Sequence, residues 1–378
     1  MPHPRLCSLQ LKPLNIPFVV AFRHASAERS ETSTLWADVA LDSGVPGCGE
    51  SCPRAYVTGE SLDSAQAFFT RHEGAIREQI VDLPSLRQWV ASSAQEIDAN
   101  PAAWCAIELA ILDAFARDGH QTVERLLSLP ELHGAFRYTA VLGDAHPQAF
   151  KATADQYRRF GFSDFKLKLS GDLERDRAKM AVMRGLDTEL VRVRVDANNL
   201  WSAADEAIRF LRSLDYPLFA VEEPLGPNQY DQLAHMSDAL GCPIILDESL
   251  LRVEQLATLP DPPTRWMINV RVSKMGGLLR SLRVVDAAHR LTLGLIVGAQ
   301  VGETSLLTRA ALTVARAGGD ALVAHEGAFG TRLLARDVCD PPLMFGQGGI
   351  LDTAHFPALR RTGFGILSSA SSKKPFGA

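Results

Sequence analysis

Residues 191–248, VRVRVDANNLWSAADEAIRFLRSLDYPLFAVEEPLGPNQYDQLAHMSDALGCPIILDE, contain three acidic side chains that each close an apolar run. These are Asp196, Glu222 and Asp247, separated by almost equal steps (222 − 196 = 26; 247 − 222 = 25). A spacing of about 25 residues accommodates one strand, one helix and two short loops. We therefore expect the three carboxylates at equivalent ends of neighbouring parallel strands.

Further apolar runs on both sides extend this pattern to eight predicted strands. They cover residues 137–143, 165–169, 191–196, 218–222, 244–247, 266–272, 294–300 and 321–325. Helical periodicity separates most of them, as in residues 172–185, 202–214, 278–291 and 305–318. Strand–helix alternation repeated eight times predicts an α/β fold of the (β/α)₈ TIM-barrel type, which carries its functional groups at the C-terminal strand ends.

The chain is long enough for a second domain, because 378 residues exceed the roughly 250 of a typical barrel. We expect an α+β capping domain over residues 1–125, the barrel over 126–350, and a C-terminal segment over 351–378 that returns to the cap. Local signals in the cap are a strand at 34–41, glycine-rich turns at 42–49, and helices at 61–83 and 84–97.

Charge and cysteine usage narrow the class of protein. The net charge is −5 without a long basic run, which gives no indication of a nucleic-acid or anionic-membrane partner. No apolar run reaches the ~18–20 residues of a membrane span, and the N-terminus lacks a signal-like core, so a cytoplasmic protein is expected. The six cysteines show no C-x-x-C pair, so the spacing of Cys48 and Cys52 predicts no zinc site.

Two lysines mark the second predicted barrel strand. Lys166 and Lys168 are two residues apart, so both should enter the barrel interior while Leu167 packs outward. The alternative is a solvated edge strand, but a closed barrel has no edges. Two like charges near a bound cation lower a lysine pKa from its usual ~10.4 toward neutrality. The pair is therefore predicted to supply a base for proton abstraction.

The three carboxylates predict a metal site. A single acidic residue after a strand is often a helix cap or an ion-pair partner. Three converging carboxylates would instead repel one another, and their hard oxygen atoms suit Mg²⁺, or Mn²⁺, in octahedral coordination. We expect Asp196, Glu222 and Asp247 to be the metal ligands.

These residues carry a resemblance to a known family. Residues 165–169 (FKLKL), 195–199 (VDANN), 221–225 (VEEPL), 245–249 (ILDES) and 267–277 (MINVRVSKMGG) resemble the enolase superfamily, and the lysine pair resembles its muconate lactonizing enzyme (muconate cycloisomerase) subgroup. The resemblance implies that Mg²⁺ holds a substrate carboxylate while Lys168, tuned by Lys166, removes the α-proton to give an enediolate. It places Asn198 and Glu248 beside the ligands, and we expect a homo-oligomer.

One departure from the family pattern bears on the reaction. The family's second catalytic lysine corresponds to Arg271, with Lys274 three residues further on. Arginine stays protonated and is a poor base. Arg271 is expected to act as a fixed cation or to bind a second anionic group, although an outward ion pair with a barrel helix is an alternative. A lyase or cycloisomerase that uses one base is the leading prediction.

Two other functions stay open. One is an amino acid or dipeptide racemase or epimerase, in which His325 or Lys274 replaces the missing base. The other is a non-catalytic carboxylate-binding barrel, against which the retained lysines and ligands argue. Further candidates for contact with a small carboxylate substrate lie at the last strand ends and in two expected lid loops, 17–29 and 48–59. They are Phe22, His24, Arg54, Tyr56, Gln300, Glu303 and His325, of which His325 is a candidate general acid.

Overall fold

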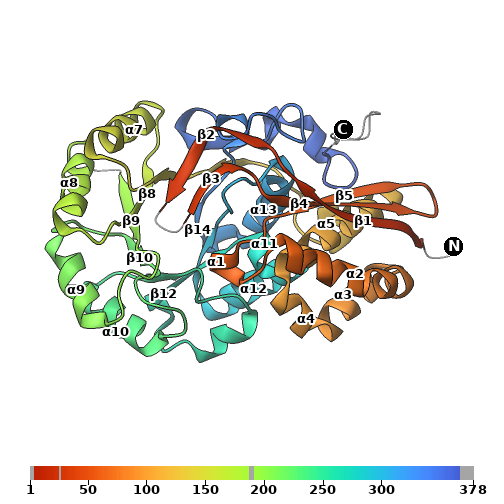
Figure 1. Ribbon diagram of the computed structural model, residues 1–378, viewed down its shortest axis with the longest axis horizontal. Coiled ribbons are helices and arrows are strands. Elements are labelled where there is room, and N and C mark those ends of the chain that lie inside the picture. The colour runs from red at the N-terminus through yellow and green to blue at the C-terminus, as the bar shows by residue number, and fades with distance from the viewer. Residues whose placement is uncertain (1–3, 25–26, 187–190, 367–378) are drawn as a thin grey trace.

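Eight parallel strands form one curled sheet in which each strand pairs with its neighbour in the sequence, as the computed structural model of residues 4–24, 27–186 and 191–366 shows (Figure 1). The strands are β7 (Ala140–Leu142), β8 (Asp164–Lys168), β9 (Arg192–Asp196), β10 (Ala220–Glu222), β11 (Ile244–Leu246), β12 (Trp266–Val270), β13 (Gly294–Val297) and β14 (Leu322–His325). The backbone N–H of Thr139, beside β7, donates to the carbonyl of His325 in β14 over 2.8 Å. This bond joins the two ends of the sheet and confirms the predicted barrel.

The barrel interior has an apolar floor beneath a polar upper layer. Ala220, Ile245, Ile296 and Ala324, from four different strands, form a small cluster separate from the main core. Side chains two residues apart on a strand share a face, so the residues two positions further along each strand also point inward. The sheet thereby delivers a ring of polar side chains to its C-terminal end.

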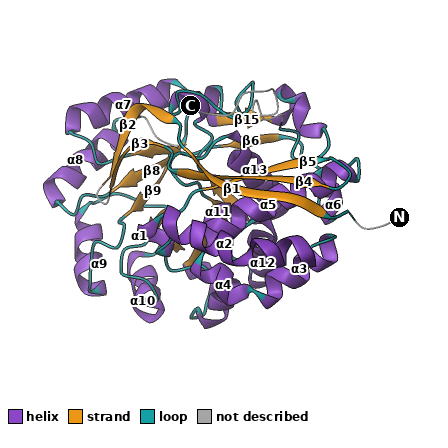
Figure 2. Ribbon diagram, turned by 45° about the vertical axis from the view of Figure 1, so that its right-hand side comes forward, coloured by secondary structure: helices purple, strands orange, loops and turns teal. Residues whose placement is uncertain are grey.

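Helices cover the outside of the sheet (Figures 1 and 2). They are α7 (Pro147–Arg159), α8 (Leu173–Arg184), α9 (Ala204–Ser213), α10 (Tyr230–Leu240), α11 (Val272–Met275), α12 (Leu278–Leu291) and α13 (Ser305–Gly318). The expected alternation fails twice. After β11 the chain forms two short 3₁₀ helices, η1 (Val253–Thr258) and η2 (Pro263–Arg265), and after β14 it forms no α-helix among the described residues.

The N-terminal part combines sheet and helix, as predicted. Strands β1 (Leu6–Leu14), β4 (Thr34–Leu41) and β5 (Pro46–Ser51) form an antiparallel sheet, and β2 (Pro17–His24) pairs with β3 (Ala27–Glu31). The helices are α1 (Ala55–Thr58), α2 (Leu62–Gln79), α3 (Leu83–Ser92), α4 (Ala94–Ala99), α5 (Pro101–Asp118) and α6 (Val123–Leu127). Three local expectations were wrong. The turns at 42–49 end in β5, the stretch 84–97 divides at Ser93, and the loop at 17–29 is largely a hairpin.

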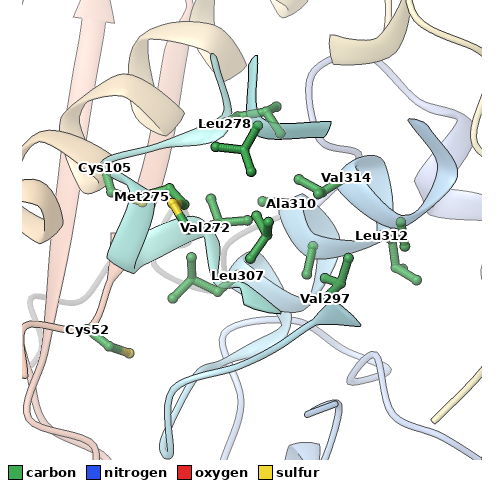
Figure 3. Packing of buried hydrophobic residues seen from close by; sticks show 14 of the residues in the cluster. Cys52, Cys105, Val272, Met275, Leu278, Val297, Leu307, Ala310, Leu312 and Val314 are labelled. Carbon is green, nitrogen blue, oxygen red and sulfur yellow. The ribbon is translucent and has the colours of Figure 1, made fainter. Parts of the chain in front are cut away.

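Helix α5 has no counterpart in the predicted elements. Every residue from Pro101 to Ala116 is buried, so this helix lacks the polar stripe by which helical periodicity is recognised. Strand β5 packs directly on it, and a Cβ at Gly49 would collide with the carbonyl of Ala106. Figure 3 shows Val272 and Met275 of α11 between Cys105 of α5 and Leu307 of α13. Helix α5 therefore connects the N-terminal sheet to the barrel.

Three buried glutamates bond to the N-termini of helices. Glu50 of β5 accepts hydrogen bonds from the start of α13, Glu60 from the start of α5, and Glu108 of α5 from the start of α12. Backbone N–H groups at a helix start have no partner within the helix, so each carboxylate satisfies them. Burial raises the pKa of Glu50 to about 8 and those of Glu60 and Glu108 to about 7.

The described part of the C-terminal segment lies against α5 and α6. Strand β15 (Ile350–Asp352) pairs with β6 (Ala135–Arg137), and short 3₁₀ helices occur at η3 (Gly319–Ala321), η4 (Gly330–Arg332), η5 (Gln347–Gly349), η6 (Thr353–His355) and η7 (Pro357–Arg360). Phe364 N–H donates to Asp113 of α5, and Arg117 donates to the Ile366 carbonyl. We propose the domain bounds 1–125, 126–350 and 351–378 on this basis. No helix in the described residues is long and apolar enough to cross a membrane.

Candidate active site

The predicted site residues gather at the C-terminal ends of β8 to β12. Lys168 is in register with Asp196, and Asp196 with Glu222. Asp247 and Arg271 each come directly after the last residue of their strands, β11 and β12. All three carboxylate residues are 1% exposed. The strand register thus brings the five residues to one end of the barrel interior.

Lys168 lies at the mouth of this cluster. Its Nζ donates to Oδ2 of Asp196 over 2.5 Å and to Oδ1 of Asn198 over 2.9 Å. Burial disfavours the charged form of Asp196, but Lys168 and Lys166 outweigh it and hold the pKa of Asp196 well below its usual range. Asn198 therefore lies beside the site, as predicted, and is a direct partner of the lysine.

Lys166 lies deeper and contacts three carboxylates. Its Nζ is 2.7 Å from Glu222, 3.1 Å from Asp196 and 3.3 Å from Glu326. Burial acts to lower the pKa of Lys166, but these negative charges outweigh burial and raise it. Leu167 is fully buried on the outer face, as expected. The predicted inward direction of both lysines is confirmed.

Two cations hold Asp247. Arg271 Nη2 donates to Oδ2 of Asp247, and its Nη1 donates to Gln300 over 3.1 Å. Lys274 Nζ donates to Oδ1 and to the backbone carbonyl of Asp247, and to the carbonyl of Asn269. Burial, and then the charge of Arg271, lower the pKa of Lys274 to about 7. The outward ion pair considered for Arg271 is wrong, because its side chain points into the barrel.

A glycine makes room for this arrangement. Gly298 follows β13 at an inward position, and a Cβ there would collide with Oδ1 of Asn269 and crowd Cγ of Arg271. Asn269 in turn donates to Glu222 over 3.2 Å. Asn269 and Arg271 therefore occupy the space that a side chain at position 298 would need.

The proposed metal ligands carry the right donors, but in this structure they bind cations of the protein. Among the described residues, no three histidine, cysteine, aspartate or glutamate side chains converge closely enough to hold a metal ion as they stand. Lysine and arginine groups contact Asp196, Glu222 and Asp247 instead. However, Oε2 of Glu222 is buried and has no hydrogen-bond partner in the described part of the chain. An orphaned carboxylate oxygen among hard oxygen donors fits Mg²⁺.

Three further predicted residues lie around this cluster. Glu248 is mostly buried, and burial, then Glu223 and Asp196, raise its pKa to about 7. Gln300 is buried against Arg271. Glu303 accepts from the backbone N–H of Gln300 over 2.6 Å, and burial raises its pKa to about 7. Their roles toward a substrate stay predictions.

His325 points away from the barrel interior. Ala324 belongs to the interior cluster, so its neighbour His325 faces outward, where its ring stacks on Tyr138 at 4.2 Å. Neither ring nitrogen has a hydrogen-bond partner in the described residues, and burial lowers the His325 pKa to about 3. The role of general acid therefore has no support in the geometry. Glu326 is the inward residue at this strand end.

The candidates from the N-terminal part lie in varied settings. Arg54 is 1% exposed and donates to the backbone carbonyls of Thr32, Ser33, Pro53 and Val301, which ties the N-terminal part to the loop after β13. Tyr56 in α1 is 40% exposed. The side chains of Phe22 and His24 lie outside the described residues. Substrate contact by these four stays a prediction.

Several site residues were not singled out from the sequence. Arg194 of β9 is 1% exposed and donates to Asp164 over 2.6 Å and to Glu326 over 2.7 Å. Glu223 accepts from the backbone N–H groups of Asp247 and Ser249. Arg194 lies two residues before Asp196, so strand periodicity was the signal that would have identified it as inward. Glu223 lies in the loop after β10 and bonds to the loop after β11, a contact between loops that strand periodicity does not cover.

The family model for the Enolase C-terminal domain-like family matches residues 149–367, more than half of the chain. This chain belongs to the enolase superfamily. It is therefore an enzyme, which sets aside a purely non-catalytic barrel. The L-Lys-D/L-Arg epimerase of Methylococcus capsulatus is 26% identical over 372 residues, which cover 96% of this chain and 99% of that protein.

Solved structures show the same fold across the superfamily. A muconate lactonizing enzyme from Pseudomonas fluorescens, complexed with muconolactone, has a TM-score of 0.84 and 22% identity and covers 98% of both chains. A dipeptide epimerase from Cytophaga hutchinsonii, complexed with Mg and the dipeptide D-Ala-L-Val, has a TM-score of 0.83 and 22% identity, covering 98% of this chain and 97% of that one. The barrel with an N-terminal cap is thus the fold of this enzyme.

Proposed function

We propose that this enzyme removes the proton α to the carboxylate of a small-molecule substrate, with Lys168 as the base. The observation that supports this choice is the difference in exposed fraction between the lysine side chains that point into the barrel. The Lys168 side chain is 18% exposed, against 3% for Lys166 and 0% for Lys274. A base has to come within hydrogen-bond distance of the proton that it removes, and Lys168 is the lysine of this group that a substrate can approach.

We propose Mg²⁺ as the cofactor, held by Asp196, Glu222 and Asp247. The ion would neutralise charge that develops on the substrate carboxylate, without which an α-proton is far too weakly acidic for an amine base. The cations of the chain contribute as well. Lys166 is buried among the carboxylates and stays charged, and Arg271 fixes Asp247 from the side of β12.

We propose epimerisation or racemisation of an amino acid derivative as the first candidate outcome. The support is comparative, because relatives that match 80% or more of this chain include an N-succinyl-L-Arg/Lys racemase, an L-Lys-D/L-Arg epimerase, an L-Ala-D/L-Glu epimerase and a hydrophobic dipeptide epimerase. This favours the alternative considered from the sequence over the lyase or cycloisomerase. Such a reaction needs a proton donor on the second face. Lys274, whose pKa burial lowers to about 7, is the candidate, and because its side chain is fully buried it would have to release Asp247 and move toward the substrate.

A specific observation keeps the one-base lyase or cycloisomerase as the second candidate. Strands β8 and β12 lie four places apart in an eight-stranded barrel and so face each other. Lys168 therefore faces Arg271, whose guanidinium is held by Asp247 and Gln300. A guanidinium cannot accept a proton at neutral pH. In this candidate the enediolate formed by Lys168 proceeds by elimination or ring closure.

Exchange with solvent deuterium separates the two candidates. The Mg²⁺-loaded enzyme is incubated in D₂O with each antipode of N-succinyl amino acids and dipeptides, and α-deuteration is read by mass spectrometry. Epimerisation predicts exchange of both antipodes, whereas the one-base reaction predicts exchange of one antipode. Chelation by EDTA is expected to stop exchange in either case. If none of the carboxylates in the panel exchanges its α-proton, the proposed function is contradicted.

A further inference from the structure

A cavity of about 420 Å³ lies outside the candidate active site, between the N-terminal helices and the barrel. Helices α3 and α4 form one wall, and η1 and α12 form the other. Figures 1 and 2 show α4 beside α12. No proposed ligand or catalytic residue lines it. Its volume falls within the range of small-molecule sites.

The positive and negative charges of the side chains that line the cavity are unequal in number. Arg252, Arg280 and Arg283 provide three positive charges, whereas Asp98 and Glu254 provide two negative ones. Asp98 is shared, since it accepts from both Arg280 and Arg252. Nη1 of Arg280 is buried and has no acceptor among the described residues. The lining thus has one positive charge more than its own carboxylates match.

Apart from Gln95, Gln255 and Thr258, the rest of the lining is apolar, and it is continuous with the active-site segments. Val90 and Val284 come from opposite walls, Leu251 lies four residues after Asp247, and Met275 directly follows Lys274. An apolar pocket with a few fixed charged groups matches a ligand that has an apolar body and a charged end. Arginine binds carboxylates through two parallel N–H donors.

We propose that this cavity binds a small organic anion, with its carboxylate on Arg280 and Arg252 and its apolar body against Leu251, Met275 and Val284. Charge complementarity selects an anion, and the single surplus charge selects a monocarboxylate. The shared Asp98 is the internal competitor, because it already occupies donors of both arginines. The site is distinct from the proposed catalytic centre and does not depend on the proposed function.

The test uses 4-phenylbutyrate and its uncharged analogue 4-phenylbutanamide as probes, with calorimetry on the full-length protein in EDTA. The carboxylate is expected to bind saturably and the amide at least tenfold more weakly. Arg280→Gln should weaken carboxylate binding at least tenfold, whereas Asp98→Asn should tighten it, since both arginines are then released. A purely structural pair would lose stability in both variants without these opposite changes in affinity.

Two further variants guard against misfolding and against binding elsewhere. Ala94 is exposed at the start of α4, so Ala94→Trp fills the cavity without disturbing the core and should abolish binding. Lys168→Ala should leave binding unchanged. The proposal is overturned if 4-phenylbutyrate does not bind, if Lys168→Ala weakens binding as Arg280→Gln does, or if Ala94→Trp changes only the oligomeric state, which would identify the face as an interface between copies.

Discussion

The Lys168 side chain is more exposed than the other lysines that point into the barrel, so we expect its removal to affect catalysis most directly. Lys168→Ala is expected to reduce α-deuteration by at least ~10²-fold, the usual contribution of a positioned base. Because Lys168 also pairs with the buried Asp196, its removal should lower the thermal unfolding temperature, but by less than removal of Lys166, which contacts three carboxylates. Deuteration by mass spectrometry and a melting curve together provide the measurement.

The matched control is Lys166, which is almost fully buried among three carboxylates. Lys166→Ala should lower both exchange and the unfolding temperature, because it leaves buried negative charges without a partner. If Lys168→Ala retains full exchange, the base is another residue and the assignment fails.

At the scale of an element, the start of α5 depends on Glu60, whose carboxylate accepts from the N–H groups of Ala102 and Ala103. Burial raises the Glu60 pKa to about 7 from 4.5, so between these values the folded state binds a proton that the unfolded state has released. The stability contributed by this group is present below pH ~4.5 and is lost as pH rises through 7. Relative to Glu60→Gln, the parent should lose up to about 3 kcal/mol of unfolding free energy over this range.

Urea unfolding of both proteins at several pH values measures that difference. The glutamine loses one acceptor at every pH, which shifts the curve but not its slope. A pH-independent difference between parent and Glu60→Gln would show that the carboxyl of Glu60 titrates normally.

At the scale of the whole molecule, a buried network of ion pairs joins the strands where β14 meets β7 and closes the barrel. Arg194 joins Asp164 to Glu326, and Arg192 bonds both Asp164 and the Val323 carbonyl. Arg194→Met keeps an unbranched apolar stem but removes the guanidinium, which leaves two buried carboxylates short of a partner. Such a loss typically costs about 3–5 kcal/mol. Urea unfolding is expected to show a decrease of this size.

Arg184→Met is the control for that experiment, because Arg184 pairs with the almost fully exposed Asp215. An exposed pair contributes only about 0–1 kcal/mol. Equal losses in the two variants would mean that the network around Arg194 does not hold the barrel closed.

The sequence by itself determined the family, the order of the eight strands and the inward direction of the lysine pair. The reason is local: strand periodicity fixes which side chains share a face, and equal spacing of Asp196, Glu222 and Asp247 fixes equivalent positions on successive strands. The spans of α12 and α13 were predicted without error, because each has one apolar face.

Tertiary structure alone decided which charged groups meet. Whether Arg271 holds Asp247, whether Glu326 reaches Lys166, and whether His325 stacks on Tyr138 depend on strands far apart in the sequence. Helix α5 was missed for the same reason, since its all-apolar surface is explained only by the sheet and helices that surround it. Local patterns encode the direction of a side chain. The partner that the side chain meets, and therefore its pKa, is set by packing across the molecule.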